Sequence, residues 1–161
     1  IHLYSGVQLE HRNLGLALQA ALYRTADDLA RIAPMAGHIR LCKGAYDEPD
    51  SVAWRHPGEV DASFDQLLDE LMRAENVLPA IATHDDERIE LTRKLAEQRR
   101  EPFEFQMLYG IRGRLQEQLE RDGYRVRVYV PYGDSWYPYL TRRLAERPAN
   151  LWFFLRALVG K

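Results

Sequence analysis

Short apolar segments alternate along this chain with longer amphipathic segments. Five of the short segments have the length and apolar content of buried strands, and they cover residues 14–20, 38–42, 77–83, 103–108 and 125–130. The clearest helix lies between the second and third of them, where apolar residues recur at helical spacing. These residues are Val60, Phe64, Leu67, Leu68, Leu71 and Met72. Five strand–helix units in succession predict an α/β fold with a parallel sheet, and they leave open whether that sheet is doubly wound or part of a (β/α)8 barrel.

The other helices are predicted from capping residues and periodicity. Thr25 is expected to be the N-cap of a helix, because Asp28 follows it in the spacing of a capping box. Further helices are predicted over residues 85–100, 113–121 and 138–146, the last with a proline in its first turn. The final apolar segment, residues 151–159, is expected to form a helix that docks on the rest of the domain.

Composition and charge exclude several classes of protein. The chain has 161 residues, of which 46% are apolar and 29% charged, and this is typical of one soluble globular domain. Its net charge of −2 provides no basic surface for nucleic acid, and no apolar run is long enough to span a membrane. The glycine motifs of dinucleotide and P-loop sites are absent. The single cysteine, Cys42, excludes an internal disulfide and a cysteine-based zinc site, and it fits a reducing, cytoplasmic location.

Polar side chains occur near the carboxyl end of each predicted strand. They are Gln19, Arg40 with Lys43, Thr83 with His84, Gln106, and Tyr129. Strands covered on both faces are normally almost entirely apolar, and a buried polar group without a partner costs roughly 1–3 kcal/mol. Because open α/β sheets and barrels both bind ligands at this edge, the pattern predicts a ligand site there.

Each of these groups also has a purely structural interpretation. Gln19 and Gln106 could be hydrogen-bonded residues of the interior, and the Thr-His-Asp run at 83–85 could combine a helix N-cap with a hydrogen-bonded histidine. No metal site is expected, because no second His or Cys lies at ligand spacing. Arg40 lies between two apolar residues and requires an anionic or hydrogen-bonding partner, which favours a functional role.

A second candidate site lies on the helix predicted over residues 138–146. Arg142 and Arg143 share one side of this helix with Tyr139 and Glu146. Glu146 can hold one guanidinium in place while the other receives a carboxylate through two parallel hydrogen bonds. A pair of arginines often belongs to a solvated face, but the neighbouring aromatic rings favour a receptor for a small carboxylate ligand.

Several strings of this sequence resemble bacterial proline dehydrogenase in order and spacing. They are IRLCKGAY, PAIATHD, FEFQMLYGIR, RVRVYVPYG and WYPYLTRRLAERPAN, with LALQAALYRT upstream. The resemblance covers residues 13–155, and the first and last of the five strings are very specific in combination. Members of that family are flavoenzymes on a (β/α)8 barrel. They oxidise L-proline to 1-pyrroline-5-carboxylate, with FAD as hydride acceptor and a quinone as oxidant of the reduced flavin.

The resemblance implies roles for the residues that match the family's motifs. The implied FAD-binding residues are Gln19, Arg40, Lys43, Gly44, Ala45, Thr83 and His84. The implied proline-binding residues are Arg142 and Arg143 at the carboxylate, Glu146 paired with them, and Tyr129, Tyr139 and Leu108 around the ring. Arg40 would lie near the reacting end of the isoalloxazine. Arg40, Arg142 and Arg143 are therefore the expected catalytic residues.

Two features depart from the family pattern. Cys42 stands where the family has valine, which would place a thiol near the flavin. A (β/α)8 barrel takes about 250 residues, and the five units match strands four to eight, followed by a C-terminal helix, with residues 1–12 in the helix before the fourth strand. We therefore expect one catalytic domain over residues 1–161 that is incomplete on its N-terminal side. A lysine and an aspartate of the family's active site would lie in the missing part.

Two other functions are compatible with these residues. The arginine pair could bind a carboxylate or another anion in a non-catalytic module, and a half-barrel could associate with a partner chain that supplies the remaining strands. If the protein reduces a quinone, it could also lie peripherally at the inner membrane. The apolar segment 151–159 would then contact the bilayer surface instead of docking on the barrel.

Overall fold

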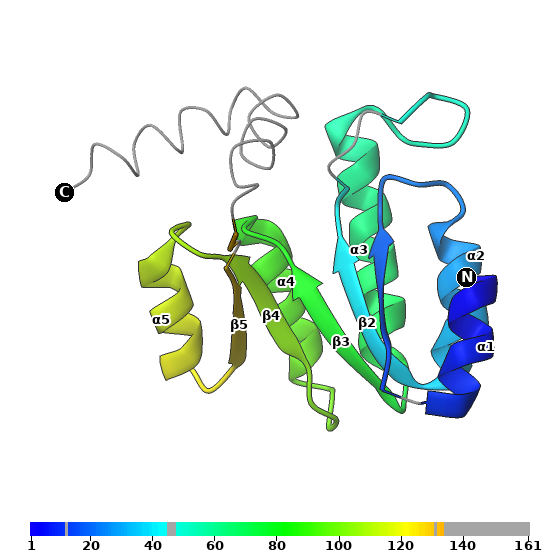
Figure 1. Cartoon of the computed structure of the whole chain (residues 1–161). Coiled ribbons are helices and arrows are strands. Elements are labelled where there is room, and N and C mark those ends of the chain that lie inside the picture. Colours follow the sequence, from blue (N-terminus) through cyan, green and yellow to red (C-terminus); the bar gives the residue numbers. More distant parts are fainter. Residues whose placement is uncertain (12, 45–47, 131, 134–161) are drawn as a thin grey trace.

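The computed structural model describes residues 1–11, 13–44, 48–130 and 132–133 (Figure 1). Its strands are β1 (Gly15–Gln19), β2 (Gly37–Cys42), β3 (Val77–Ala82), β4 (Glu104–Leu108) and β5 (Arg125–Tyr129). Its helices are α1 (His2–His11), α2 (Thr25–Ile32), α3 (Pro57–Arg73), α4 (Asp86–Ala96) and α5 (Gly113–Arg121), and a short 3-10 helix, η1 (Ala33–Met35), follows α2. All five predicted strands are confirmed, and α1 is the helix expected before the first of them. The helices predicted over residues 138–146 and 151–159 lie outside the described residues.

The strands form one parallel sheet in the sequential order β1-β2-β3-β4-β5. A doubly wound sheet reverses its strand order at a switch point, and the described sheet has no such reversal. Helices α2 to α5 follow the strands around the outer side of the curved sheet (Figure 1). This is the arrangement of consecutive units of a (β/α)8 barrel, so the fold is of the TIM-barrel type.

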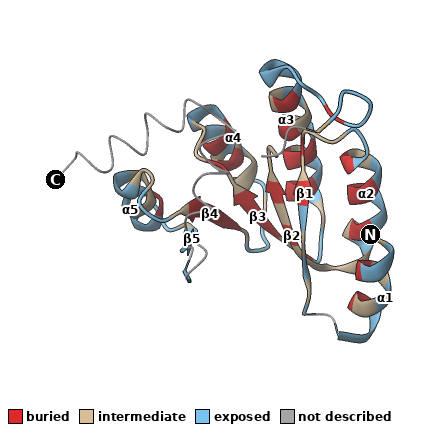
Figure 2. Ribbon diagram, turned by 45° about the horizontal axis from the view of Figure 1, so that its top comes forward, coloured by how far each residue is buried: buried red, intermediate tan, exposed pale blue. Residues whose placement is uncertain are grey.

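The core lies between the outer side of the sheet and the helices. Alternate strand residues point into it, and the most completely buried are Ile39, Leu41, Ile81, Phe105 and Met107. All six apolar residues of the predicted helical pattern in α3 are buried, which confirms that helix and its face (Figure 2). Helix α5 contributes Leu119, which is fully buried. The strands are therefore fixed in position by packing on one side, and their other side is left for polar residues.

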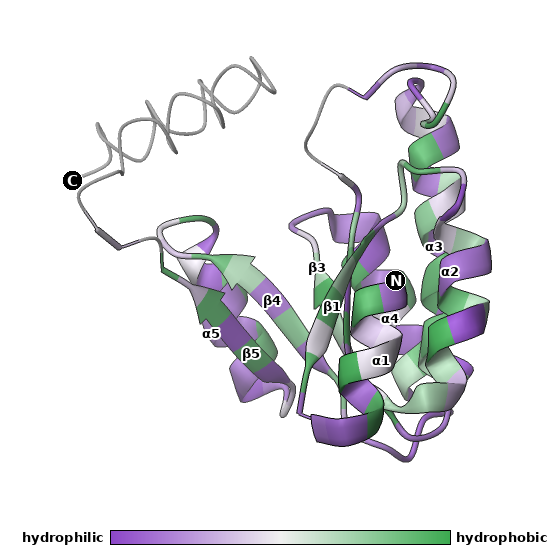
Figure 3. Cartoon of the chain, turned by 45° about the vertical axis from the view of Figure 1, so that its right-hand side comes forward, coloured by the Kyte–Doolittle hydropathy of each residue, from purple (hydrophilic) through white to green (hydrophobic). Residues whose placement is uncertain are grey.

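The inner side of the sheet carries the alternate set of strand residues, and many of them are polar. Hydrophobic and hydrophilic positions alternate along β4 and β5 (Figure 3). Glu104 and Gln106 of β4 pair in register with Arg125 and Arg127 of β5. Since successive strand residues point to opposite faces, these charged and polar side chains share the face that the helices do not cover.

One predicted cap is wrong. Helix α2 begins at Thr25, and Arg24 occupies the N-cap position without a capping hydrogen bond from its side chain. The hydroxyl of Thr25 instead donates a hydrogen bond of 2.6 Å to the backbone carbonyl of Gln19 at the end of β1. Asp28 accepts hydrogen bonds from Arg24 at 2.6 and 3.1 Å. The chain turns back sharply between β1 and α2, so both side chains are used to hold this turn and not to close a capping box.

None of the helices in the described part of the chain is long and apolar enough to cross a membrane.

Candidate active site

The inner side of the sheet is hollowed over β1, β2, β4 and β5. The hollow has a volume of about 470 Å³. Its lining residues are Gly15, Leu16, Ala17, His38, Arg40, Gln106, Arg127, Val128, Tyr129 and Val130. Three of the polar residues predicted at the strand ends, Arg40, Gln106 and Tyr129, therefore meet on one surface. This convergence is the first requirement of a ligand site.

Arg40 is the most suggestive residue of the hollow. It is half-buried on β2, and its register neighbours are Ala17 on β1 and Ala80 on β3, whose small side chains leave space beside it. The side chain makes no hydrogen bond or ion pair with any other residue that the structure describes. A partly buried cation in this state is a candidate for binding an anionic or electron-rich ligand.

A carboxylate cluster lies beside Arg40 on the same face. Glu104 is buried and receives two hydrogen bonds from Arg127, at 2.7 and 2.9 Å, and one from Gln106 at 2.7 Å. Nε2 of His38 lies 3.2 Å from Oε1 of Glu104, within ion-pair distance but without hydrogen-bond geometry. Burial alone would raise the pKa of Glu104, but the hydrogen bonds from Arg127 and Gln106 and the charge of Arg127 bring it below its ordinary value. Gln106 thus has the structural role that the sequence left open.

Sequence reasoning missed three members of this cluster: His38, Glu104 and Arg127. Each lies two positions before a predicted site residue on the same strand and therefore points to the same face of the sheet. His38 precedes Arg40, Glu104 precedes Gln106, and Arg127 precedes Tyr129. Alternation was therefore the available signal. The pairing of these residues across β2, β4 and β5 depends on strand register, which the sequence does not display.

Glu104 should make stability depend on pH. Its folded-state pKa lies below the unfolded-state value near 4.5, so its contribution is complete above pH 4.5 and is lost as the pH falls through the lower folded-state pKa. We expect Glu104→Gln to cost about 1.5–3 kcal/mol at pH 7, the usual worth of hydrogen bonds to a charged group. The measurement is urea unfolding of the natural full-length protein between pH 3 and 7. The difference between wild type and Glu104→Gln should shrink towards pH 3.

The control for this experiment is Glu117→Gln. Glu117 is 69% exposed, and its one ion pair among the described residues is with Arg121, one helical turn away, at 3.4 Å. Its replacement should change stability by no more than about 0.5 kcal/mol at any pH. A pH slope for Glu104→Gln that equals the wild-type slope would contradict the assigned role of Glu104.

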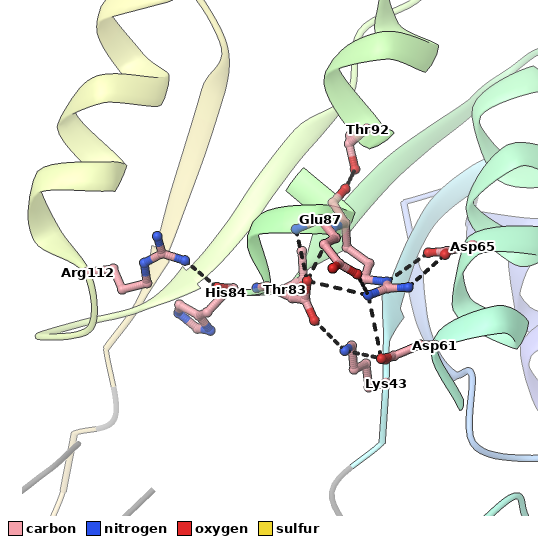
Figure 4. Close-up of polar contacts among 10 residues, drawn as sticks. Lys43, Asp61, Asp65, Thr83, His84, Glu87, Thr92 and Arg112 are labelled. Atoms are coloured by element: carbon pink, nitrogen blue, oxygen red, sulfur yellow. Dashed lines mark hydrogen bonds and ion pairs between the residues drawn. The ribbon is translucent and has the colours of Figure 1, made fainter. Parts of the chain in front are cut away.

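His84 follows β3 and is held by the end of β4. The backbone N–H of Leu108 donates to Nε2 of His84 over 3.0 Å. Arg112 donates to the backbone carbonyl of His84 over 2.6 Å (Figure 4). Burial, and secondly the positive charge of Arg112, lower the pKa of His84 to about 4. The imidazole is therefore uncharged at neutral pH.

Lys43 belongs to a network of charges between the end of β2 and helices α3 and α4 (Figure 4). Its ammonium contacts Asp61 and lies 2.7 Å from Asp85. Asp85 also accepts hydrogen bonds from the N–H groups of Glu87 and Arg88, and so it caps α4. The ammonium of Lys43 is therefore engaged by two carboxylates.

The remaining residues predicted at the strand ends lie close to this network. Thr83 is buried, and its hydroxyl accepts a hydrogen bond from the N–H of Asp85. Gly44 has a φ of +116°, and a Cβ at this position would lie 3.0 Å from Cβ of Ala21 and 3.2 Å from Oε1 of Gln19. Only glycine suits this close approach of the chain after β2 to the end of β1.

The structure thus brings most of the predicted site residues to one end of the sheet. Gln19, Arg40, Lys43, Gly44, Thr83, His84, Leu108 and Tyr129 all lie on or just after the carboxyl halves of the strands. Ala45, Tyr139, Arg142, Arg143 and Glu146 lie outside the described residues.

The sequential parallel sheet, its outer helices and the polar inner hollow define a protein of the (β/α)-barrel class, a class whose sites lie at the carboxyl ends of the strands. Comparison with known families is more specific. The pattern of the family described as "Proline dehydrogenase" matches residues 2–156. The chain belongs to this family, which confirms the resemblance in its motifs.

Individual relatives agree with this assignment. The chain is 42% identical to proline dehydrogenase 1 of Bacillus subtilis (strain 168), a match that covers 100% of this chain and 54% of that protein. It is 41% identical to proline dehydrogenase of Deinococcus radiodurans, over 91% of this chain and 48% of that protein. The chain therefore spans about half the length of the curated relatives it matches.

Solved structures show the same fold. One is proline utilization A (PutA) from Bdellovibrio bacteriovorus, inactivated by N-propargylglycine, which superposes with a TM-score of 0.80 at 25% identity. That match covers 89% of this chain and 18% of the other. A bifunctional PutA protein superposes with a TM-score of 0.76 at 27% identity, over 92% of this chain and 18% of that protein.

Proposed function

We propose that the protein containing this chain is a flavoenzyme that oxidises L-proline to 1-pyrroline-5-carboxylate, and that a quinone reoxidises its FAD. Family membership supports the substrate, and the site supports the class of chemistry. The observation that carries the proposal is Arg40, a half-buried cation over the hollow with no partner among the described residues. A positive charge at this place would favour the reduced, anionic form of a flavin.

The ends of β1 and β2 also suit a large cofactor. Gly44 allows the backbone to approach closely where any side chain would be strained, and the uncharged His84 lies at the end of the neighbouring strand. The proposed FAD-binding residues are Gln19, Arg40, Lys43, Gly44, Ala45, Thr83 and His84. Because the ammonium of Lys43 is held by Asp61 and Asp85, we assign its FAD contact to the backbone.

The proposed substrate site combines the hollow with the motif after β5. Arg142 and Arg143 would bind the proline carboxylate, and Glu146 would pair with them. Leu108, Tyr129 and Tyr139 would line the ring. When bound, FAD would accept the hydride that leaves C5 of proline, while the ring nitrogen loses its proton and a C–N double bond forms. Fixing the ring in this orientation can contribute about 7–11 kcal/mol to lowering the barrier.

The first experiment is the visible spectrum of the natural full-length protein. We expect the yellow absorption of oxidised flavin, which should bleach when L-proline is added without oxygen and return when a quinone is added. A protein without a flavin band, even after addition of FAD, would contradict the proposal. D-proline is the control, because its carboxylate points to the opposite face of the ring and would not meet the proposed arginine pair while C5 keeps the same position.

One observation favours a second candidate, a half-barrel that binds a carboxylate only together with a partner chain. Strands β1 and β5 end the sheet, and each pairs with one strand among the described residues. The solution mass separates the two possibilities. A single chain that oxidises proline supports the enzyme, whereas a complex with a second polypeptide that binds proline without oxidising it supports the half-barrel.

A further inference from the structure

The hydrogen bond at His84 determines which ring nitrogen carries the proton. The N–H of Leu108 donates to Nε2 over 3.0 Å, so Nε2 must present a lone pair. An uncharged imidazole whose Nε2 is unprotonated carries its proton on Nδ1. His84 can therefore offer one N–H donor to a ligand, and it offers no positive charge.

Arg112 fixes the geometry on which this depends. It lies in the loop between β4 and α5 in the left-handed conformation, with a φ of +53°, which is unfavourable for a residue with a side chain. Its guanidinium donates to the carbonyl of His84 and to Asp86 of α4, both over 2.6 Å. The arginine thus joins the end of β3, the start of α4 and the loop after β4.

Gln116 of α5 also binds this loop. Its amide donates to the carbonyls of Leu108 and Ile111, over 2.9 and 2.7 Å. Since the N–H of Leu108 is the donor to His84, the loop, the imidazole and Arg112 form one hydrogen-bonded unit. A backbone strain that neighbouring contacts maintain is typical of functional sites.

The described carboxylates near His84 are paired with cations other than the imidazole. Arg112 is the charged group that lowers its pKa, and burial is the larger cause. Asp86 is ion-paired with Arg112, while Asp85 is engaged with Lys43 at the end of β2. Both carboxylates at the start of α4 therefore have cationic partners other than the imidazole.

We propose that Arg112 is a positioning residue that locks His84 as an uncharged Nδ1–H donor to an acceptor atom of the cofactor at the end of β3. The identity of the cofactor as a flavin rests on the proposed function, but the state of His84 does not. Because the imidazole of His84 does not change its charge near neutral pH, the hydrogen bond that it donates should keep its strength there. The affinity for the cofactor should therefore be independent of pH in this range.

The test follows the ring nitrogens of His84 by ¹⁵N NMR in the natural full-length protein, together with flavin affinity from pH 5.5 to 8. In the wild type we expect Nδ1 protonated, Nε2 unprotonated and an affinity independent of pH. In Arg112→Gln, we expect His84 to titrate at higher pH and flavin binding to weaken by about 3–10-fold, the usual value of one hydrogen bond. Arg112→Lys should restore part of both. Arg121→Gln is the control, since Arg121 is 69% exposed on α5.

Two outcomes would overturn the proposal: a wild-type His84 protonated on Nε2, or an Arg112→Gln protein in which the tautomer, the titration and the pH profile of binding all remain unchanged. If Arg112→Gln does not fold, the comparison of wild type with Arg112→Lys decides in the same way. Absence of flavin binding in a wild type whose His84 has the expected tautomer would overturn the proposed function and the cofactor contact, whereas the holding of His84 by Arg112 is decided by the ¹⁵N data alone.

Discussion

Replacing Arg40 with methionine is expected to slow the reduction of bound flavin by proline about 10²–10³-fold, the usual loss when one group that stabilises developing negative charge is removed. Methionine keeps most of the length of the side chain and removes its charge. Because Arg40 has no partner among the described residues, its removal leaves no carboxylate unpaired there. Stability should therefore change little. The measurement is anaerobic stopped-flow reduction, with flavin content determined on the same sample.

A matched control for this change is Arg125→Met. Arg125 also lies on a strand of the sheet, but at the start of β5, and it does not line the hollow. We expect its reduction rate to equal that of the wild type within about twofold, as for a surface change away from the site. A wild-type rate in Arg40→Met with full flavin content would remove the observation that carries the proposed function.

Replacing Arg88 with methionine is expected to reduce the free energy of unfolding by about 3 kcal/mol, the lower end of the range for breaking a buried ion pair. The Arg88 side chain is only 10% exposed, and it donates to both oxygens of Asp65 over 2.9 and 2.8 Å. The hydrogen bonds from Arg88 to Asp65 raise the pKa of Arg88 further, with Asp61 and Asp85 adding to the effect. Without the guanidinium, Lys43 would be left to balance the carboxylates. We expect the lower end of the range for breaking a buried ion pair because Asp65 is 34% exposed, so water can still hydrate its carboxylate.

Arg73→Met provides the comparison for this prediction. Arg73 pairs with Asp69 on α3 over 2.9 Å, but its side chain is 76% exposed. An exposed pair of this kind contributes no more than about 1 kcal/mol. Urea unfolding of both variants in the natural full-length protein gives the two values. Equal costs for Arg88→Met and Arg73→Met would show that the network between β2, α3 and α4 adds nothing to stability.

The strands and the helix at 60–72 could be predicted because their signals are local. Each strand is a short apolar run, and one face of α3 carries a strict 3.6-residue period. The N-cap at Thr25 could not be predicted correctly, because the same hydroxyl is used by the carbonyl of Gln19, six residues away across a turn. The Thr25 side chain therefore forms a hydrogen bond outside the helix in place of the local capping bond.

The candidate site was predictable in outline and not in its pairings. The rule that parallel strands end at one edge was sufficient to bring Arg40, His84 and Tyr129 to one end of the sheet. The partners of these and neighbouring residues come from distant segments. Lys43 pairs with Asp61 of α3 and with Asp85 at the N-cap of α4. Glu104 accepts hydrogen bonds from Arg127 of β5, a strand that begins 21 residues later in the chain. Such pairings depend on how helices and strands pack, and no spacing along the chain encodes them.

The sequential strand order has a consequence for how this domain folds. Each strand pairs with the strand next in the chain, and each helix packs near the strands that flank it in sequence. Paired positions of neighbouring strands are therefore only 21 to 40 residues apart in the chain, and this costs less loop-closure entropy than pairing strands from distant parts of the sequence. On the ribosome, β1 and β2 can pair before β4 has been synthesised, so the sheet can grow by one unit at a time in the order of translation.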